Sequence, residues 1–163
     1  MDDQFIFSEE EGSIEPEELV SWNILVVDDD ADVHVATKLT LDKVTILGKP
    51  LNLIDVNSGR EAIITLKANN QIDLILLDMI MESNQAGLDV ANWLRHEAGC
   101  HDKPIIILRT GQPGLLKDSE ILQNKNIDAV VEKSAITRSS FIELLTRMLQ
   151  GSLNKSTTPD GKQ

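Results

Sequence analysis

The chain has 163 residues, enough for one domain of ordinary size with short tails. Hydrophobic residues make up 41% and charged residues 26%, which excludes a wholly disordered, collagenous or coiled-coil chain. The net charge of −12 opposes direct binding to nucleic acid or to anionic lipid and favours cationic partners.

The sequence shows no sign of export or membrane insertion. Apolar runs such as 74–77 and 105–108 are far shorter than the ~20 residues that span a bilayer. The N-terminus has no basic stretch followed by an apolar one, so no secretory signal is expected. The single cysteine, Cys100, cannot form an internal disulfide. We therefore expect a cytoplasmic protein without a membrane segment.

The two ends of the chain differ in composition from its middle. Residues 1–20 carry eight of the 27 acidic side chains and no Lys or Arg, which leaves a charge of −4 on the rest. The last residues are polar and rich in Ser, Thr, Asn and Lys. We expect an acidic arm over 1–22, one domain over 23–150 and a polar tail or linker over 151–163.

Within the domain, short apolar runs alternate with longer amphipathic stretches. The apolar runs predict strands at 23–27, 51–56, 73–77, 104–108 and 129–131. Helical spacing predicts helices over 32–47, 59–68, 87–97, 115–124 and 137–149. Strands that are apolar throughout are typical of a parallel sheet covered on both faces. The alternation predicts βαβ crossovers and a doubly wound parallel α/β sheet.

Two of these helices carry a recognisable start. Ser58 with Glu61, and Ser140 with Glu143, fit the S-x-x-E capping box, in which side chain and backbone satisfy each other's hydrogen-bonding groups. The pattern predicts N-caps at Ser58 and Ser140.

Polar side chains follow the ends of four predicted strands. They are Asp28, Asp29 and Asp30 after the first strand, Asp78 after the third, Thr110 after the fourth and Lys133 after the fifth. Ligands of open α/β sheets bind beyond the carboxyl ends of the strands. We therefore expect these residues to share one edge of the sheet.

Clustered carboxylates need a cation, because each close pair repels by about 4 kcal/mol at an effective dielectric constant of 20. An all-oxygen set with no His or Cys ligands favours Mg²⁺ over zinc. A carboxylate beside Mg²⁺ can attack phosphorus and form an acyl phosphate. Asp78, alone at the end of a central strand, is the best nucleophile, and Asp28 and Asp29 can share the metal. Lys133 and Thr110 can then bind phosphoryl oxygens.

Four segments together resemble the receiver domain of bacterial two-component response regulators. They are ILVVDDD at 24–30, LILLDM at 74–79, LRTG at 108–111 and VVEK at 130–133. The resemblance runs over about 23–150. It implies a (βα)5, flavodoxin-like fold with the strand order 2-1-3-4-5.

The resemblance also implies a site and partners. Asp78 would be phosphorylated by a sensor histidine kinase or a phosphotransfer protein, and the domain could form a homodimer. Asp29, Asp78 and the backbone carbonyl of Ile80 would hold Mg²⁺, with Asp28 acting through water. Thr110 and Lys133 would engage the phosphoryl group, as their chemistry already suggests.

A narrower likeness concerns the segments DMIMESNQAGLDV at 78–90 and ILRTGQPG at 107–114. They are similar to receivers that precede an HD-GYP cyclic-di-GMP phosphodiesterase. This likeness implies an output domain beyond the C-terminus of the chain. The chain itself would then be a signalling domain rather than an enzyme.

The sequence departs from the common receiver pattern at four positions. Ser134 follows the strand-end lysine in place of Pro, and Gly111 follows the threonine in place of Ala. Val130 occupies a position where many receivers have a switch aromatic residue. Glu82 replaces a frequent Pro, and we hypothesise that it alters metal affinity or phosphoryl lifetime.

Two other functions fit part of the pattern. A haloacid-dehalogenase-type phosphatase also uses Asp-x-Asp after its first strand, here Asp28 and Asp30. That family needs a later acidic pair, but only Glu143 and Asp160 follow Lys133. The second alternative is a pseudo-receiver that binds partners without phosphorylation.

The remaining candidates have simpler interpretations. We expect Arg109, beside Thr110, to be an exposed charge at the end of its strand, with contact to an incoming phosphodonor or a partner as the alternative. His34, His96 and His101 share no metal-binding spacing and are interpreted as structural residues.

Overall fold

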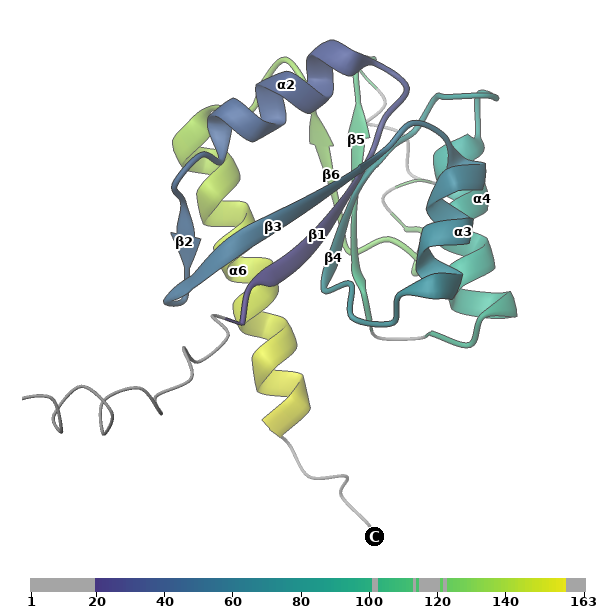
Figure 1. Cartoon of the computed structure of the whole chain (residues 1–163). Coiled ribbons are helices and arrows are strands. Elements are labelled where there is room, and N and C mark those ends of the chain that lie inside the picture. The colour runs from purple at the N-terminus through teal and green to yellow at the C-terminus, as the bar shows by residue number, and fades with distance from the viewer. Residues whose placement is uncertain (1–19, 101–102, 113, 115–120, 122, 158–163) are drawn as a thin grey trace, which may run out of the picture.

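The computed structural model describes residues 20–100, 103–112, 114, 121 and 123–157 (Figure 1). The strands are β1 (Trp22–Val27), β2 (Thr45–Ile46), β3 (Lys49–Val56), β4 (Leu74–Asp78), β5 (Ile105–Thr110) and β6 (Ala129–Glu132). The helices are α2 (Ala31–Thr40), α3 (Gly59–Ala68), α4 (Ala86–Asn92), the π-helical turn η3 (Trp93–Glu97) and α6 (Arg138–Thr157). In this part of the chain the strands form one sheet in the order β2-β3-β1-β4-β5-β6.

The parallel part of the sheet has the predicted order. β3, β1, β4, β5 and β6 pair in parallel, which is 2-1-3-4-5 when only these strands are counted. The prediction of a wholly parallel sheet was wrong, because β2 adds an antiparallel pair at the edge beside β3. The described sheet is therefore mixed.

The β2–β3 hairpin also shortens the first predicted helix. α2 ends at Thr40 instead of continuing to residue 47. The two turn residues, Leu47 and Gly48, have φ angles of 53° and 79°, a combination that closes a two-residue hairpin. Glycine adopts a positive φ readily, so Gly48 suits this turn. The hairpin was not predicted because the hydrophobic spacing of 41–46 is equally compatible with a helix.

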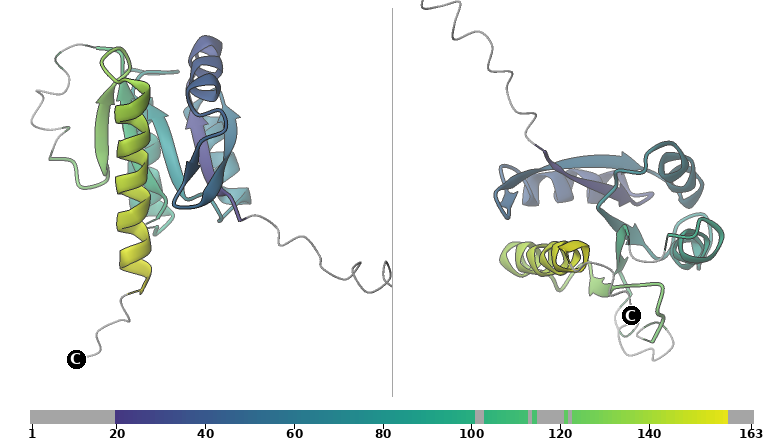
Figure 2. Two further views of the ribbon diagram at one scale, coloured as in Figure 1. Left: turned by 90° about the vertical axis from the view of Figure 1, so that its left-hand side faces the viewer. Right: turned by 90° about the horizontal axis from the view of Figure 1, so that it is seen from below.

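The sheet lies between two helical layers, with α3 and α4 on one face and α2 and α6 on the other (Figure 2). Ala62 and Val90 pack on the first face, and Phe141 and Leu145 on the second. Strands β1, β4 and β5 are buried on both faces, which explains their uninterrupted apolar sequences. Each fully buried Leu or Ile side chain contributes roughly 1.5–3 kcal/mol to stability.

The two predicted helix starts have different outcomes. Ser58 caps α3 as predicted, since its Oγ accepts a hydrogen bond from the Glu61 N–H at 3.0 Å. The N-cap predicted at Ser140 was wrong, because α6 already begins at Arg138. There, Thr137 Oγ1 accepts from the Ser140 N–H at 3.2 Å, and Ser140 Oγ accepts from the Thr137 N–H at 3.0 Å. This reciprocal pair of hydrogen bonds caps α6 at Thr137, one turn before the N-cap that the S-x-x-E pattern predicts.

Further predictions concern the two ends of the chain and the helix predicted over 115–124. α6 continues to Thr157, past the start of the polar tail expected at residue 151. Most of the predicted helix over 115–124 lies outside the described residues, as do 1–19 of the acidic arm and 158–163 of the tail. Among the helices that the structure describes, none has the length and apolar character needed to cross a bilayer.

Candidate functional site

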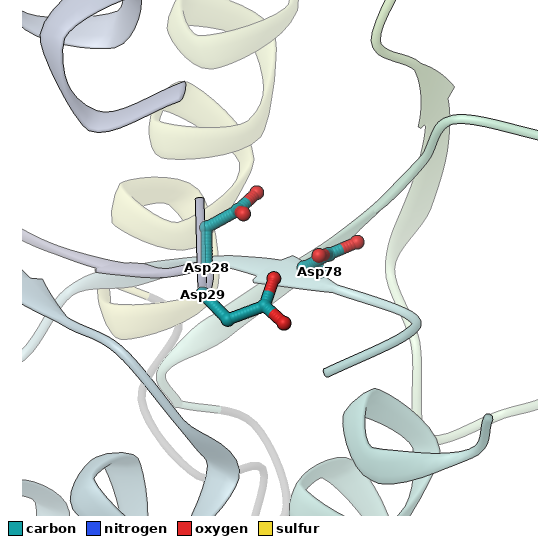
Figure 3. Close-up of side chains that lie close together, drawn as sticks. All are labelled: Asp28, Asp29 and Asp78. Atoms are coloured by element: carbon teal, nitrogen blue, oxygen red, sulfur yellow. The ribbon is translucent and has the colours of Figure 1, made fainter. Parts of the chain in front are cut away.

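Three carboxylates meet at the carboxyl edge of the sheet. Asp28 and Asp29 directly follow β1, and Asp78 ends β4, which pairs with β1 (Figure 3). One oxygen from each carboxylate lies within 4.8 Å of the others. Asp28 and Asp78 are buried, with exposed fractions of 1% and 5%, whereas Asp29 is exposed. The expectation that distant segments bring these acids together is confirmed by this geometry.

Lys133 reaches the buried pair from the end of β6. Its Nζ lies 2.7 Å from Asp28 Oδ2 and 3.2 Å from Asp78 Oδ1. Asp28 Oδ1 accepts a hydrogen bond from the Asp30 N–H at 2.9 Å. Asp28 Oδ2 has this ion pair but no aligned hydrogen-bond donor. A single ammonium group therefore serves two buried carboxylates, and it is the one partner that the described residues give to Asp28 Oδ2.

The electrostatics of Asp78 reflect this shortage of positive charge. Burial raises the pKa of Asp78 above its ordinary value of 3.8, and the neighbouring Asp28 carboxylate raises it further. The Lys133 ammonium and the Ile80 backbone N–H lower the pKa only in part. The ionised form of Asp78 is thus less stable in this pocket than in water, and a nearby cation would stabilise it.

Thr110 lies at the same edge of the sheet. It is 1% exposed, and its Oγ1 accepts from the Gln112 N–H at 3.1 Å. Its backbone carbonyl accepts from the Lys133 N–H at 2.8 Å, which ties the ends of β5 and β6 together. Asp78 pairs with Arg109 in the sheet register, so Thr110 is one residue beyond the strand position beside Asp78.

The donor set fits a hard divalent cation. The three clustered groups offer only carboxylate oxygens, and the buried Asp28 Oδ2 has its ion pair with Lys133 but no aligned hydrogen bond. Oxygen ligands at one or two carboxylates suit Mg²⁺, which completes its octahedron with waters and substrate oxygens. The cluster can therefore hold a metal ion.

The structure corrects the interpretation of Arg109, which is buried with an exposed fraction of 9%. Its Nη1 donates to Thr37 Oγ1 at 3.0 Å, and its guanidinium lies over the Phe141 ring at 5.8 Å from the centroid. Burial lowers the pKa of Arg109, while Asp28 and Asp78 oppose that shift. The apolar run that predicts this strand ends at Leu108, whereas β5 continues to Thr110, so the sequence carried no clear signal for this burial.

His34 supports the loop that carries the acids. Its Nε2 lies 2.8 Å from the Asp28 carbonyl oxygen, and its Nδ1 lies 3.1 Å from Asp55 Oδ1. Lys38 pairs with the other oxygen of Asp55. The buried imidazole thus connects the end of β1 to β3, a structural role as expected. His96 is exposed, and His101 lies outside the described residues.

Glu82 lies in the loop after Asp78 but is not one of the clustered acids. Its carboxylate accepts from the Gly59 N–H at 2.8 Å and the Arg60 N–H at 3.3 Å, at the start of α3. Burial raises the pKa of Glu82, but these N–H groups outweigh that effect and lower it. Its charge is therefore engaged with α3, a contact that sequence reasoning missed.

Gly87 was also missed. Its N–H donates to the Met79 carbonyl at 3.0 Å, and a Cβ at this position would lie 2.3 Å from the Asp78 carbonyl oxygen. No other residue allows α4 to approach the end of β4 so closely. A glycine in the first turn of a predicted helix was the available signal.

Comparison with known proteins gives one curated relative. The 3′3′-cGAMP-specific phosphodiesterase 2 of Vibrio cholerae is 36% identical over 129 residues, which cover 79% of this chain and 24% of the relative. The chain therefore spans about a quarter of the length of the curated relative it matches. No protein-family model matches the chain.

Solved structures share the fold. A response regulator receiver protein from Sinorhizobium medicae is 25% identical with a TM-score of 0.65, over 82% of this chain and 98% of that chain. The signal receiver domain of an HD domain-containing protein from Pseudomonas fluorescens is 17% identical with a TM-score of 0.66, over 83% and 99%. A receiver domain protein from Clostridium thermocellum is 20% identical with a TM-score of 0.63, over 83% and 96%.

Proposed function

The chain is a response regulator receiver domain of two-component signalling, and from that premise we propose that Asp78 is its phosphoacceptor. The observation that carries the proposal is a buried Asp78 beside two further carboxylates and one ammonium group. Such a pocket holds more negative charge than its own cation balances. Binding of a divalent cation and transfer of a phosphoryl group both use that surplus of oxygen ligands.

Mg²⁺ is the cation that we assign to the pocket. Asp29, Asp78 and the Ile80 carbonyl would hold it, with Asp28 acting through water. Bound Mg²⁺ would neutralise the carboxylates and the oxygens of an incoming phosphoryl group. His34 contacts the backbone carbonyl of Asp28, and Lys133 pairs with its side chain, so both help to hold Asp28 in place.

Transfer requires a free carboxylate oxygen on Asp78. That oxygen attacks the phosphorus of a phosphohistidine, the P–N bond breaks and the leaving imidazole takes up a proton. The product is an acyl phosphate with a charge of about −2. The Lys133 ammonium, already 3.2 Å from Asp78, and the Thr110 hydroxyl would bind the phosphoryl oxygens.

The partners follow from this chemistry. The donor would be a sensor histidine kinase or a phosphotransfer protein in the cytoplasm. The relative from Vibrio cholerae is a phosphodiesterase of which the chain matches 24%. We infer that phosphorylation here regulates an output domain, of the HD-GYP phosphodiesterase type, outside this chain. The chain would transmit the signal without turning over a substrate of its own.

The phosphatase alternative loses support at Asp30. That reading needs Asp28 and Asp30 as a catalytic pair, but Asp30 is the N-cap of α2 and accepts from the Asp32 N–H at 2.9 Å. The cluster instead joins Asp28 with Asp29 and Asp78. The pseudo-receiver alternative predicts the same fold without phosphoryl uptake, so the experiment below separates it.

Intact-protein mass spectrometry tests the proposal. With acetyl phosphate and Mg²⁺, the wild type should gain one phosphoryl group, and hydroxylamine should remove it because it cleaves acyl phosphates. Asp78→Asn should gain none. Asp89→Asn, which changes an exposed aspartate on α4, is the matched control and should behave as wild type. Equal uptake by Asp78→Asn, or no uptake by folded wild type, would refute the assignment.

A further inference from the structure

A second buried cation lies on the same face of the sheet as the acid pocket. Arg109 pairs with Asp78 in the β4–β5 register, and paired residues of neighbouring strands point to the same face. Both Asp28 and Asp78 act electrostatically on its guanidinium. Arg109 therefore belongs to the electrostatic environment of the pocket.

Contacts fix the guanidinium at a distance from the acids. Nη1 is held by Thr37 Oγ1 on α2, and the group lies over Phe141 of α6. Among the described residues, Arg109 makes no ion pair, whereas Lys133 pairs with both buried acids. Arg109 thus acts on the carboxylates through space, without a direct ion pair.

The stability of the fold does not explain a buried guanidinium at this position. The preceding side chains on the same face of β5, Ile105 and Ile107, are aliphatic and fully or almost fully buried. Burying a charge without a direct counter-ion is unfavourable, and an aliphatic side chain beside Phe141 would avoid that penalty. The charge therefore calls for a functional explanation.

The charge balance of the pocket supplies a functional explanation for Arg109. The metal-free pocket holds three carboxylates, Asp28, Asp29 and Asp78, against two cations, Lys133 and Arg109. A bound Mg²⁺ leaves this set with an excess of positive charge, and an acyl phosphate restores the balance by adding about one negative charge. Without Arg109, the metal alone would come closer to neutralising the pocket.

We propose that Arg109 is a buried positioning charge that weakens Mg²⁺ binding to the resting pocket and strengthens retention of the phosphoryl group. The first part of this proposal, the metal half, concerns Mg²⁺ affinity and rests on the acid cluster. The second part, the phosphoryl half, concerns retention of the phosphoryl group and also rests on the function proposed above. The domain would then gain most of its pocket stabilisation only when both ligands are present. Arg109 would couple metal binding to phosphorylation.

Two substitutions at this position test the proposal. Arg109→Met removes the charge but fills the space, and Arg109→Lys retains the charge. Calorimetric titration should show that Arg109→Met binds Mg²⁺ about threefold to tenfold more tightly than wild type. Its affinity for beryllofluoride, measured at saturating Mg²⁺, should fall by a similar factor. Arg109→Lys should stay within about twofold of wild type in both titrations.

A merely structural arginine would not shift the two affinities in opposite directions. Arg147→Met, which alters an exposed arginine on α6, is the matched control and should change neither affinity. Arg109→Gln also removes the charge but keeps a donor for Thr37 Oγ1, and it serves if Arg109→Met fails to fold. Both of its affinities should move in the directions expected for Arg109→Met.

Unchanged or weaker Mg²⁺ binding by folded Arg109→Met would overturn the metal half. Tighter Mg²⁺ binding with unchanged beryllofluoride affinity would overturn the phosphoryl half. An Arg109→Lys protein that matches Arg109→Met would overturn both. If wild type fails to bind beryllofluoride at all, the proposed function fails, and the Mg²⁺ titration still decides the metal half.

Discussion

The two ends of the sheet contain buried charges in opposite situations. At the amino ends of β5 and β6, Arg95 donates to the carbonyl oxygens of Cys100, Pro104 and Asn126 at 3.0, 2.8 and 3.3 Å. It also pairs with the Asp128 carboxylate at 3.1 Å. The charges balance, and the arginine has a partner for most of its donors.

At the carboxyl end of the sheet, negative charge exceeds the positive charge that pairs with it. Asp28 and Asp78 share Lys133, Asp29 adds a third carboxylate, and one buried oxygen lacks a hydrogen bond. A buried charge whose hydrogen-bonding groups have partners supports the fold, whereas buried carboxylates that are short of positive charge create a demand for a ligand. The contrast indicates which end is structural and which end binds, and the following substitutions test it.

The largest effect is expected at the satisfied end. Arg95→Met would leave the Asp128 carboxylate and several carbonyl oxygens without their donor. We expect the free energy of unfolding to fall by about 3 kcal/mol, mainly from the carbonyl oxygens that lose a charged donor, measured by urea denaturation. Mg²⁺ affinity of the folded protein should not change. A loss below about 1 kcal/mol, the value typical of exposed ion pairs, would show that the cluster is not structural.

Metal binding should stabilise the unsatisfied end. At a Mg²⁺ concentration of about 100 times its dissociation constant, wild type should gain about 2.7 kcal/mol against unfolding, and a chelator should reverse the gain. At that concentration, Asp29→Asn should gain much less because it loses a ligand. Asp89→Asn is the control and should gain as much as wild type. Equal gains in all three proteins would place the metal elsewhere.

The pH dependence of stability should reveal the raised pKa of Asp78. Burial and Asp28 raise this pKa, so the folded state holds a proton that the unfolded state releases above its ordinary pKa of 3.8. In metal-free wild type, this contribution is present at low pH and is lost as the pH rises through the raised pKa.

Asp78→Asn cannot lose that contribution. Its stability relative to wild type should therefore increase with pH and level off once the pH exceeds the raised pKa of Asp78. Urea unfolding in a chelating buffer from about pH 4 to about pH 8 measures the difference. A relative stability that falls with rising pH would mean that the Lys133 ammonium outweighs burial and Asp28 and lowers the pKa of Asp78. The pocket would then not be short of positive charge.

The smallest effect is expected at Glu82. Glu82→Gln removes the negative charge at the start of α3, and we expect a loss of about 0.5–1 kcal/mol at neutral pH. The net pKa of Glu82 lies below its ordinary value of 4.5, so its contribution is lost as the pH falls through the lowered pKa. Glu97→Gln, at an exposed site, is the control. A loss that persists at acidic pH would point to packing instead.

Sequence patterns predicted what local composition and chain topology determine. Apolar runs located the parallel strands, and parallel strands place their carboxyl ends at one edge, so Asp28, Asp78 and Lys133 had to meet. The Ser58 cap depended only on residues three apart and was likewise predictable. The receiver resemblance agrees with the solved receivers that share this fold.

The missed features depend on contacts between distant segments. The sequence around Arg109 does not show that Thr37 and Phe141 form its surroundings, so its burial required the packed helices. Glu82 caps a helix more than twenty residues earlier in the chain. The β2 hairpin required the positive φ of Leu47, which side-chain spacing does not encode.

The most direct test of the account locates the phosphoryl group. After reaction with acetyl phosphate and Mg²⁺, borohydride reduces an acyl phosphate to an alcohol, which converts the modified aspartate into homoserine. Peptide mass spectrometry should find homoserine at position 78 in wild type and should find none after metal chelation. Homoserine at Asp28 or Asp29, or at no acid of the cluster in a protein that has gained phosphate, would contradict the account.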